Sequence, residues 1–228
     1  MKIIYSTITK TGKRHNNEDS FRIVEYDADA HYMAVVCDGM GGHAMGEVAS
    51  ETVADAIVDY WTAHTDVPDS TEKVIDACHQ AMETLDKRSD AMGHIEMGST
   101  MVMVSMEGNI ATIAHVGDSR CYLQRPGEGL IYQTEDHVGL SFGWEVVTRC
   151  FFSYHRHMCV PDIAQFEVKI GDRILLCSDG VYKSMPPEIL KERMMDQKSL
   201  DDIIDVYDFL CDRNGDDNYT AVLIEITE

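Results

Sequence analysis

The chain has 228 residues, 44% of them hydrophobic, and a formal net charge of −21, which fits one domain, residues 1–228, with a sizeable core. The acidity argues against nucleic acid or membrane as a partner, because both need clustered Lys and Arg, and no apolar stretch reaches the ~20 residues of a membrane span. Seven scattered cysteines and the lack of a signal-peptide core predict free thiols and a cytoplasmic protein.

The first part of the chain predicts three strands and then two helices. The strands are expected at 3–9, 21–26 and 31–37, and the helices at about 46–60 and 71–88. In the first helix, Ala49, Val53 and Ile57 recur on one face, opposite acidic residues. Ser70 or Thr71 is expected to cap the second helix.

The rest of the chain predicts paired strands, an irregular segment, two helices and a final strand. Strands are expected at 100–106, 110–116, 121–124 and 130–133, a hairpin joins 164–168 to 173–177, helices span 186–195 and 200–211, and a strand spans 219–226. Strand pairs separated by helix pairs, without regular βαβ alternation, predict an α+β fold. We expect two antiparallel sheets packed together and flanked by helix pairs, a four-layer α-β-β-α sandwich.

Six acidic residues stand out although they are far apart in the sequence. They are Glu18 and Asp19 in RHNNEDS, Asp38 in VVCDGMGGH, Asp118 in AHVGDSR, Asp179 in ILLCSDG and Asp217 in DDNYT. Three of them follow an apolar run and precede Gly or Ser, which places a carboxylate at a strand end beside a tight turn. Converging carboxylates resist burial unless divalent cations neutralise them. The pattern predicts a metal-assisted enzyme.

Each motif taken alone also has a simpler interpretation. DGMGGH is compatible with an ordinary glycine turn, Asp217 with a capping or turn aspartate, and Arg14 beside Glu18 with a surface ion pair. Next to carboxylate-held metals, however, the guanidinium of Arg14 would be a bidentate clamp for phosphate.

In combination, the motifs resemble those of the metal-dependent Ser/Thr protein phosphatases of the type-2C (PPM) family, especially the compact bacterial branch. The matching segments, in order, are RHNNEDS, CDGMGGHAMGEVAS, MGSTMVMV, AHVGDSR, TEDH, LLCSDG and DDNYTAV. They extend from Arg14 to Val222, so the resemblance covers nearly the whole chain. It implies the same four-layer sandwich and hydrolysis of phosphoserine and phosphothreonine by a water that bridges two metal ions.

The resemblance also implies residue roles. Asp38 is expected to bridge two Mn²⁺ or Mg²⁺ ions, Asp179 and Asp217 to complete one ion's ligands, and Glu18 and the Gly39 carbonyl to serve the other. Asp19 is expected to hold metal-bound water, and Arg14 to bind the substrate phosphate. Asp38, Arg14 and Asp19 are thus the expected catalytic residues.

Three departures from the family pattern bear on the site. Lys183 stands where many members carry an aspartate that shares a third metal ion with Asp118, and its ammonium is expected to oppose or replace that cation. The flap segment around 138–160 is short. Met40 occupies the position of a histidine found in some members, so either His43 or a metal-bound water is the candidate general acid. His155, Arg156 and His157 are compatible with a metal site, but we interpret them as a solvent-exposed loop.

Two other functions stay open on the sequence alone. Lys183 and the short flap are compatible with a pseudophosphatase that binds phosphoproteins without turnover, and the same metal centre could hydrolyse a small-molecule phosphate. For the leading function we expect phosphoprotein substrates, a Ser/Thr kinase whose targets it reverses, and a monomeric protein.

Overall fold

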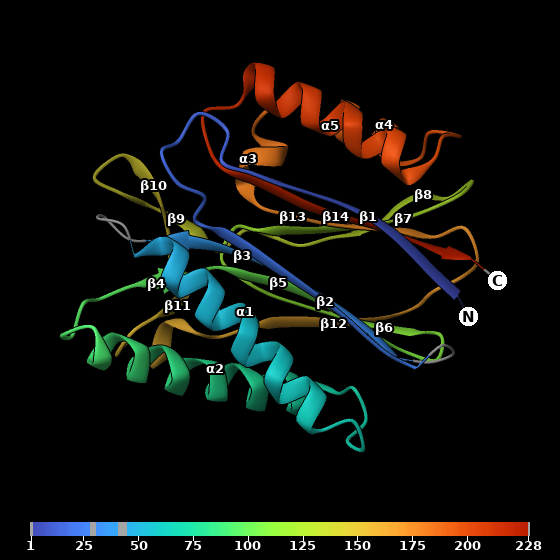
Figure 1. The fold of residues 1–228 in the computed structure, drawn as a ribbon. Helices are drawn as coiled ribbons and strands as arrows, with labels where there is room; N and C mark the ends of the chain where they lie inside the picture. The colour runs from blue at the N-terminus through green and yellow to red at the C-terminus, as the bar shows by residue number, and fades with distance from the viewer. Residues whose placement is uncertain (1, 28–30, 41–44, 228) are drawn as a thin grey trace.

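The computed structural model describes residues 2–27, 31–40 and 45–227. Two antiparallel sheets lie in the middle, and helices cover the outer face of each (Figure 1). This confirms the four-layer α-β-β-α arrangement expected from the sequence.

The first sheet has the strand order β11-β4-β3-β5-β6-β12, with β2 also paired to β3. In chain order its strands are β2 (Asp19–Asp27), β3 (His31–Met40), β4 (Gly98–Ser99), β5 (Met101–Glu107), β6 (Ile110–Val116), β11 (Phe151–Phe152) and β12 (Asp162–Glu167). Helices α1 (Gly46–Ala63) and α2 (Thr71–Ala91) pack on it. Of the two expected caps for α2, Ser70 is the one used, because its hydroxyl accepts the Lys73 N–H at 3.2 Å.

The second sheet has the order β1-β14-β13-β7-β8. Its strands are β1 (Lys2–Lys10), β7 (Arg120–Arg125), β8 (Gly129–Gln133), β13 (Arg173–Cys177) and β14 (Tyr219–Thr227). Its outer face carries α3 (Asp179–Tyr182), α4 (Pro187–Met194) and α5 (Leu200–Asn214). A 3-10 turn, η1, spans Arg156–Met158.

Three apolar cores alternate with the four layers. One lies between the first sheet and α1 with α2, one between the two sheets, and one between the second sheet and its helices. Strand β3 shows how the sequence builds this: Met33, Val35 and Cys37 enter the first core, while its alternate residues enter the inter-sheet core. Buried on both faces, β3 is a rigid base for Asp38 at its end.

Two expectations for residues 138–177 were wrong. The predicted hairpin between 164–168 and 173–177 does not form, because β12 pairs with β6 while β13 pairs with β7 and β14 in the other sheet. The segment predicted to be irregular contains a separate two-stranded hairpin, β9 (Val138–Ser141) with β10 (Trp144–Val147). It projects from one end of the sandwich (Figure 1). In the described part of the chain, no helix has the length and apolar character to cross a membrane.

Candidate functional site

A pocket of about 330 Å³ opens at one end of the sandwich, next to the β9–β10 hairpin. The charged side chains and the glycine that line it are Arg14, Glu18, Asp38, Gly39, Asp118, Glu145, Asp179, Lys183 and Asp217. A larger groove of about 820 Å³ runs between α1 and α2, but none of the predicted site residues lines it. The polar pocket is therefore the candidate site.

Antiparallel pairing brings the distant motifs together, since the end of one strand lies beside the start of its neighbour. Asp19 at the start of β2 is the register partner of Asp38 at the end of β3. Likewise, Cys177 ends β13 opposite Ala221 near the start of β14. Asp179 follows the first of these positions and Asp217 precedes the second, so both reach the same edge.

Asp19 lies behind the pocket rather than in its lining. One carboxylate oxygen accepts a hydrogen bond from the Ser178 hydroxyl at 2.7 Å. The other oxygen, Oδ1, is buried and has no hydrogen-bond partner among the described residues. Burial raises the pKa of Asp19 to about 7, although the Ser178 hydroxyl acts in the opposite direction.

The carboxylates in the pocket also destabilise one another's charge. Burial, and then the charges of Asp19 and Asp179, raise the pKa of Asp38 well above its ordinary value. Burial, and then the charge of Asp179, raise the pKa of Asp118 to about 6. Protons or cations must therefore stabilise this cluster at neutral pH.

The donor set fits hard divalent cations. Mn²⁺ and Mg²⁺ prefer oxygen ligands, and the pocket offers the carboxylates of Glu18, Asp38, Asp179 and Asp217 together with the Gly39 backbone. The Gly39 N–H donates to the Glu18 carbonyl at 3.0 Å, and a Cβ at residue 39 would overlap the backbone of Gly46. Only glycine permits this approach. The orphaned Oδ1 of Asp19 supplies one more buried acceptor beside the set.

Two cationic side chains line the pocket. The Arg14 guanidinium lies at its mouth, where Nη2 is 2.8 Å from Asp217 Oδ2 and Nε donates to the Asp216 carbonyl at 3.1 Å. Lys183 Nζ lies 2.6 Å from Asp179 Oδ2 and 3.8 Å from Asp118 Oδ2. Burial acts to lower the pKa of Lys183, but the Asp179 carboxylate outweighs it and raises that pKa. An ammonium thus sits between the two carboxylates, as Lys183 in the sequence led us to expect.

Several residues that position the site received no role from the sequence. The Thr100 hydroxyl accepts the Asp38 N–H at 2.9 Å, and the Thr100 N–H donates to the Asp38 carbonyl at 2.8 Å. The Asn218 side chain accepts the Glu18 N–H and donates to the carbonyls of Thr11 and Asn16. Thr100 stands in the quoted motif MGSTMVMV and Asn218 in DDNYT, yet only the fold reveals their partners.

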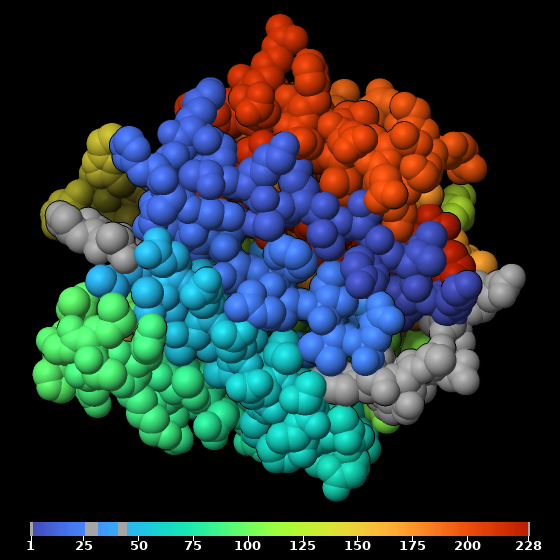
Figure 2. Space-filling model, in the orientation of Figure 1, coloured from blue at the N-terminus to red at the C-terminus, as the bar shows by residue number. Residues whose placement is uncertain are grey.

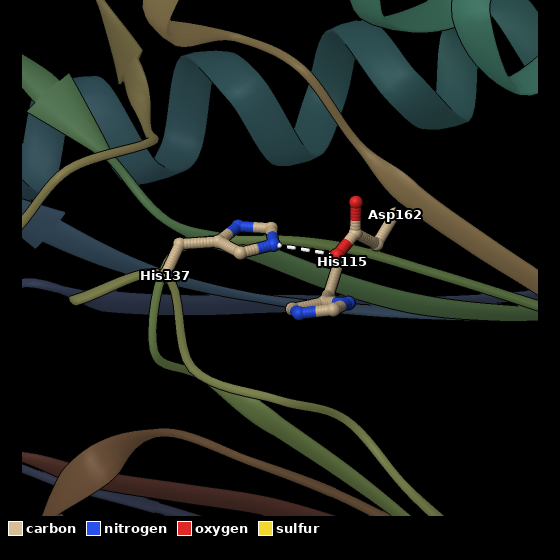
Figure 3. A group of neighbouring side chains, drawn as sticks. All are labelled: His115, His137 and Asp162. Carbon is tan, nitrogen blue, oxygen red and sulfur yellow. Dashed lines mark hydrogen bonds and ion pairs between the residues drawn. The ribbon is translucent and has the colours of Figure 1, made fainter.

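His115, His137 and Asp162 form a second group of potential metal ligands, beside the base of the hairpin (Figure 3). Its hydrogen bonds do not suit a metal. His137 Nδ1 accepts the Gly117 N–H at 3.1 Å, and Nε2 lies 3.0 Å from Asp162 Oδ2 and 3.2 Å from Arg149 Nη1, so both ring nitrogens are already engaged. The Arg149 guanidinium, 2.8 Å from Asp162 Oδ1, already supplies a cation. We interpret the group as the anchor of the β9–β10 hairpin.

The remaining histidine candidates stay away from the pocket or outside the described part of the chain. His43 is outside the described residues, and Met40, at the position where some family members carry a histidine, lines the pocket. His155 precedes the surface turn η1 and lies 3.4 Å from Glu96. Within the described ranges, the His155–His157 segment belongs to no group of potential metal ligands.

Comparisons with known proteins agree on one family. The Protein phosphatase 2C family matches residues 10–225. "Serine/threonine phosphatase stp" of Listeria innocua is 30% identical over 93% of this chain and 91% of its own. The crystal structure of the Mycobacterium tuberculosis serine/threonine phosphatase PstP/Ppp superposes over all of both chains with a TM-score of 0.84 and 27% identity. The PstP catalytic domain in complex with two manganese ions gives a TM-score of 0.80 at 28% identity over 99% of each chain.

Proposed function

The chain belongs to the protein phosphatase 2C family and is a metal-dependent serine/threonine protein phosphatase, and we propose that the pocket around Asp38 is its catalytic centre. One observation carries this assignment: buried or partly buried carboxylates from motifs as distant as residues 18 and 217 converge without enough cations to neutralise them. The PstP catalytic domain binds two manganese ions, and we propose a pair of Mn²⁺ or Mg²⁺ ions as the cofactor of this site.

In this proposal Asp38 would serve both ions, Asp179 and Asp217 would complete the ligands of one, and Glu18 with the Gly39 carbonyl would complete those of the other. When bound, such a metal pair supplies positive charge for the phosphoryl group and activates water as the nucleophile. Asp19 lies one layer deeper, and we assign its free Oδ1 to hydrogen bonds with water at the centre. Thr100 and Asn218 keep the backbones of Asp38 and Glu18 in place.

Arg14 binds the substrate phosphate in this assignment. Its Nε and Nη2 are occupied by the backbone and side chain of the neighbouring Asp216–Asp217 segment, which fixes the plane of the guanidinium. Its other N–H groups are left to grip phosphate oxygens. The side chain is 57% exposed at the pocket mouth, where a phosphoserine could reach it from solvent.

We make further proposals about the domain extent, location and substrates of the protein. Residues 1–228 form one catalytic domain, which acts in the cytoplasm as a monomer. Its substrates would be phosphoproteins made by a Ser/Thr kinase, since the names of the relatives specify serine/threonine phosphatases.

The test is Mn²⁺-dependent hydrolysis of a generic aryl phosphate and of phosphoserine and phosphothreonine peptides by the purified chain. We expect turnover of both substrate types with Mn²⁺, and none after chelation. Glu188→Gln, an exposed change on α4 away from the pocket, is the matched control. Peptide binding without any turnover would instead support the pseudophosphatase, and turnover of small phosphates alone would support a small-molecule phosphatase.

A further inference from the structure

Glu145 is a pocket carboxylate that the metal centre does not explain. The pocket's carboxylates are Glu18, Asp38, Asp118, Glu145, Asp179 and Asp217, and Glu145 alone among them comes from the β9–β10 hairpin rather than from a strand end of the sandwich. Arg14 and Lys183 pair with Asp217 and Asp179. In the part of the chain that the structure describes, no ion pair engages the exposed side chain of Glu145.

The hairpin contributes four residues to the pocket lining. They are Val138, Glu145, Val146 and Val147, and the register pairs Val138 with Val147 and Leu140 with Glu145. Because directly paired residues share a face of an antiparallel ladder, Leu140 lies directly across from Glu145 and on the same face of the hairpin. A negative charge and an apolar side chain are therefore presented together at the rim.

The tip of the hairpin is unusually apolar for an exposed turn. Leu140, Phe142 and Trp144 are 84%, 102% and 77% exposed, more than any other large hydrophobic side chain in the described residues. Phe142 and Gly143 both have positive φ, 51° and 85°. A two-residue turn of this kind favours Asn-Gly, so a bulky Phe there costs conformational free energy and gains no burial. Strain of this kind is typical of functional positions.

The position of the hairpin beside the pocket indicates which part of a substrate would contact it. It stands out at the edge of the molecule beside the blue part of the chain that follows β1, on the side away from the N-terminus (Figure 2), and its base forms part of the pocket. A chain segment that flanks a phosphoresidue in the pocket can therefore lie against the hairpin. A lysine or arginine in that segment would form an ion pair with the Glu145 carboxylate, whereas the same carboxylate would repel an acidic residue.

We propose, on the basis of the proposed phosphatase function, that the β9–β10 hairpin selects phosphoprotein segments with a basic residue next to the phosphoresidue, bound by Glu145, and an apolar side chain that packs on Leu140 and Phe142. The metal-assisted centre performs hydrolysis, and the hairpin sets which sequence reaches it.

The test compares three phosphoserine peptides that differ only beside the phosphoserine, with Arg, Ala or Glu there. In the Mn²⁺-loaded protein we expect kcat/KM to favour Arg over Ala by roughly two- to fivefold, mainly through KM, as for an exposed charge pair. Glu145→Gln should remove the preference and Glu145→Lys should invert it towards Glu. The Glu188→Gln control should keep the wild-type order. An unchanged preference in Glu145→Lys would overturn the proposal.

Binding of phosphonate analogues of the same peptides, followed by fluorescence anisotropy, gives a readout that needs no turnover. If the peptides bind in the expected order but nothing is hydrolysed, the proposed function fails and the docking surface stands. If aryl phosphate is hydrolysed and the three peptides are hydrolysed with the same kcat/KM as one another, the proposed catalytic centre is supported and the docking proposal fails.

Phe142→Asn separates a recognition role from a structural one. This change places the favoured residue in the turn, so we expect Tm to rise while kcat/KM for a peptide with an apolar neighbour falls roughly fivefold. Ile170→Asn, at another exposed hydrophobic position that is 71% exposed, is the matched control and should leave peptide kcat/KM unchanged. Unchanged peptide kcat/KM in Phe142→Asn would contradict the apolar contact.

Discussion

Lys183 Nζ lies 2.6 Å from Asp179 Oδ2, one helical turn away along α3, and both residues line the pocket proposed as the catalytic centre. The same ammonium lies 3.8 Å from Asp118 Oδ2. The chain thus carries its own cation between two carboxylates that would otherwise repel each other. We expect this arrangement to exclude a third divalent ion.

Lys183→Asp should therefore admit one more metal ion. The change replaces a cation by an oxygen ligand beside Asp118 and Asp179, so Mn²⁺ stoichiometry should rise from two to three per chain. Equilibrium dialysis with metal analysis, and Mn²⁺-soaked crystals, measure this. Lys198→Asp, an exposed change remote from the pocket, should leave the stoichiometry at two. Two ions in both variants would show that Lys183 does not control this position.

Asp38→Asn should abolish activity without unfolding the protein. Asp38 is the carboxylate assigned to both metal ions, so we expect Mn²⁺ affinity and kcat/KM to fall by more than about 100-fold. The far-UV circular dichroism spectrum should be unchanged, because Thr100 binds the Asp38 backbone and not its carboxylate. Retained metal binding at wild-type affinity would refute the shared role of Asp38.

Asp19→Asn should change the pH dependence of the metal-free protein's stability. The folded-state pKa of Asp19 is raised from 3.8 to about 7, so its stabilising contribution is complete below about pH 4 and is lost as pH rises to about 7. Asn does not titrate. In EDTA the variant should match the wild type at pH 4 and exceed its free energy of unfolding at pH 8 by on the order of 1 to 4 kcal/mol. Urea titrations at both pH values measure this difference, and equal stability at pH 8 would contradict it.

Asn218→Ala should destabilise the fold and weaken metal binding. The buried Asn218 side chain joins the Glu18 N–H to the carbonyls of Thr11 and Asn16. Its loss leaves these backbone groups unpaired, at a cost of about 1 to 3 kcal/mol in the free energy of unfolding. Asn109→Ala removes an exposed amide that bonds Glu167, and should cost less than about 0.5 kcal/mol. Equal effects of the two changes on unfolding would argue against a positioning role for Asn218.

The predicted helices and strands were confirmed where the hydrophobic pattern along the sequence was long and confined to one face. Helix α2 begins at Thr71 after the Ser70 cap, and the strands at 110–116 and 219–226 match β6 and nearly all of β14. The hairpin predicted at 164–177 was wrong. The turn residues suggested that the two strands pair with each other, but β12 pairs with β6 in the first sheet and β13 pairs with β14 in the second, and a local turn does not determine these partners. A short apolar run does not specify its partner strand.

Sequence patterns were enough to predict the fold class and to pick out the acidic residues, because strand periodicity and Asp-Gly or Asp-Ser turns are local properties. The phosphatase function came from the resemblance of the ordered motifs to a known family, and the lysine at position 183 was visible as a departure from it. The three-dimensional arrangement was needed to show that Asp19 lies behind the pocket while Glu145 lines it, and that the Lys183 ammonium reaches both Asp179 and Asp118. Burial and distance across the chain arise only when antiparallel strands bring their ends together, and these quantities set the charge balance of the site.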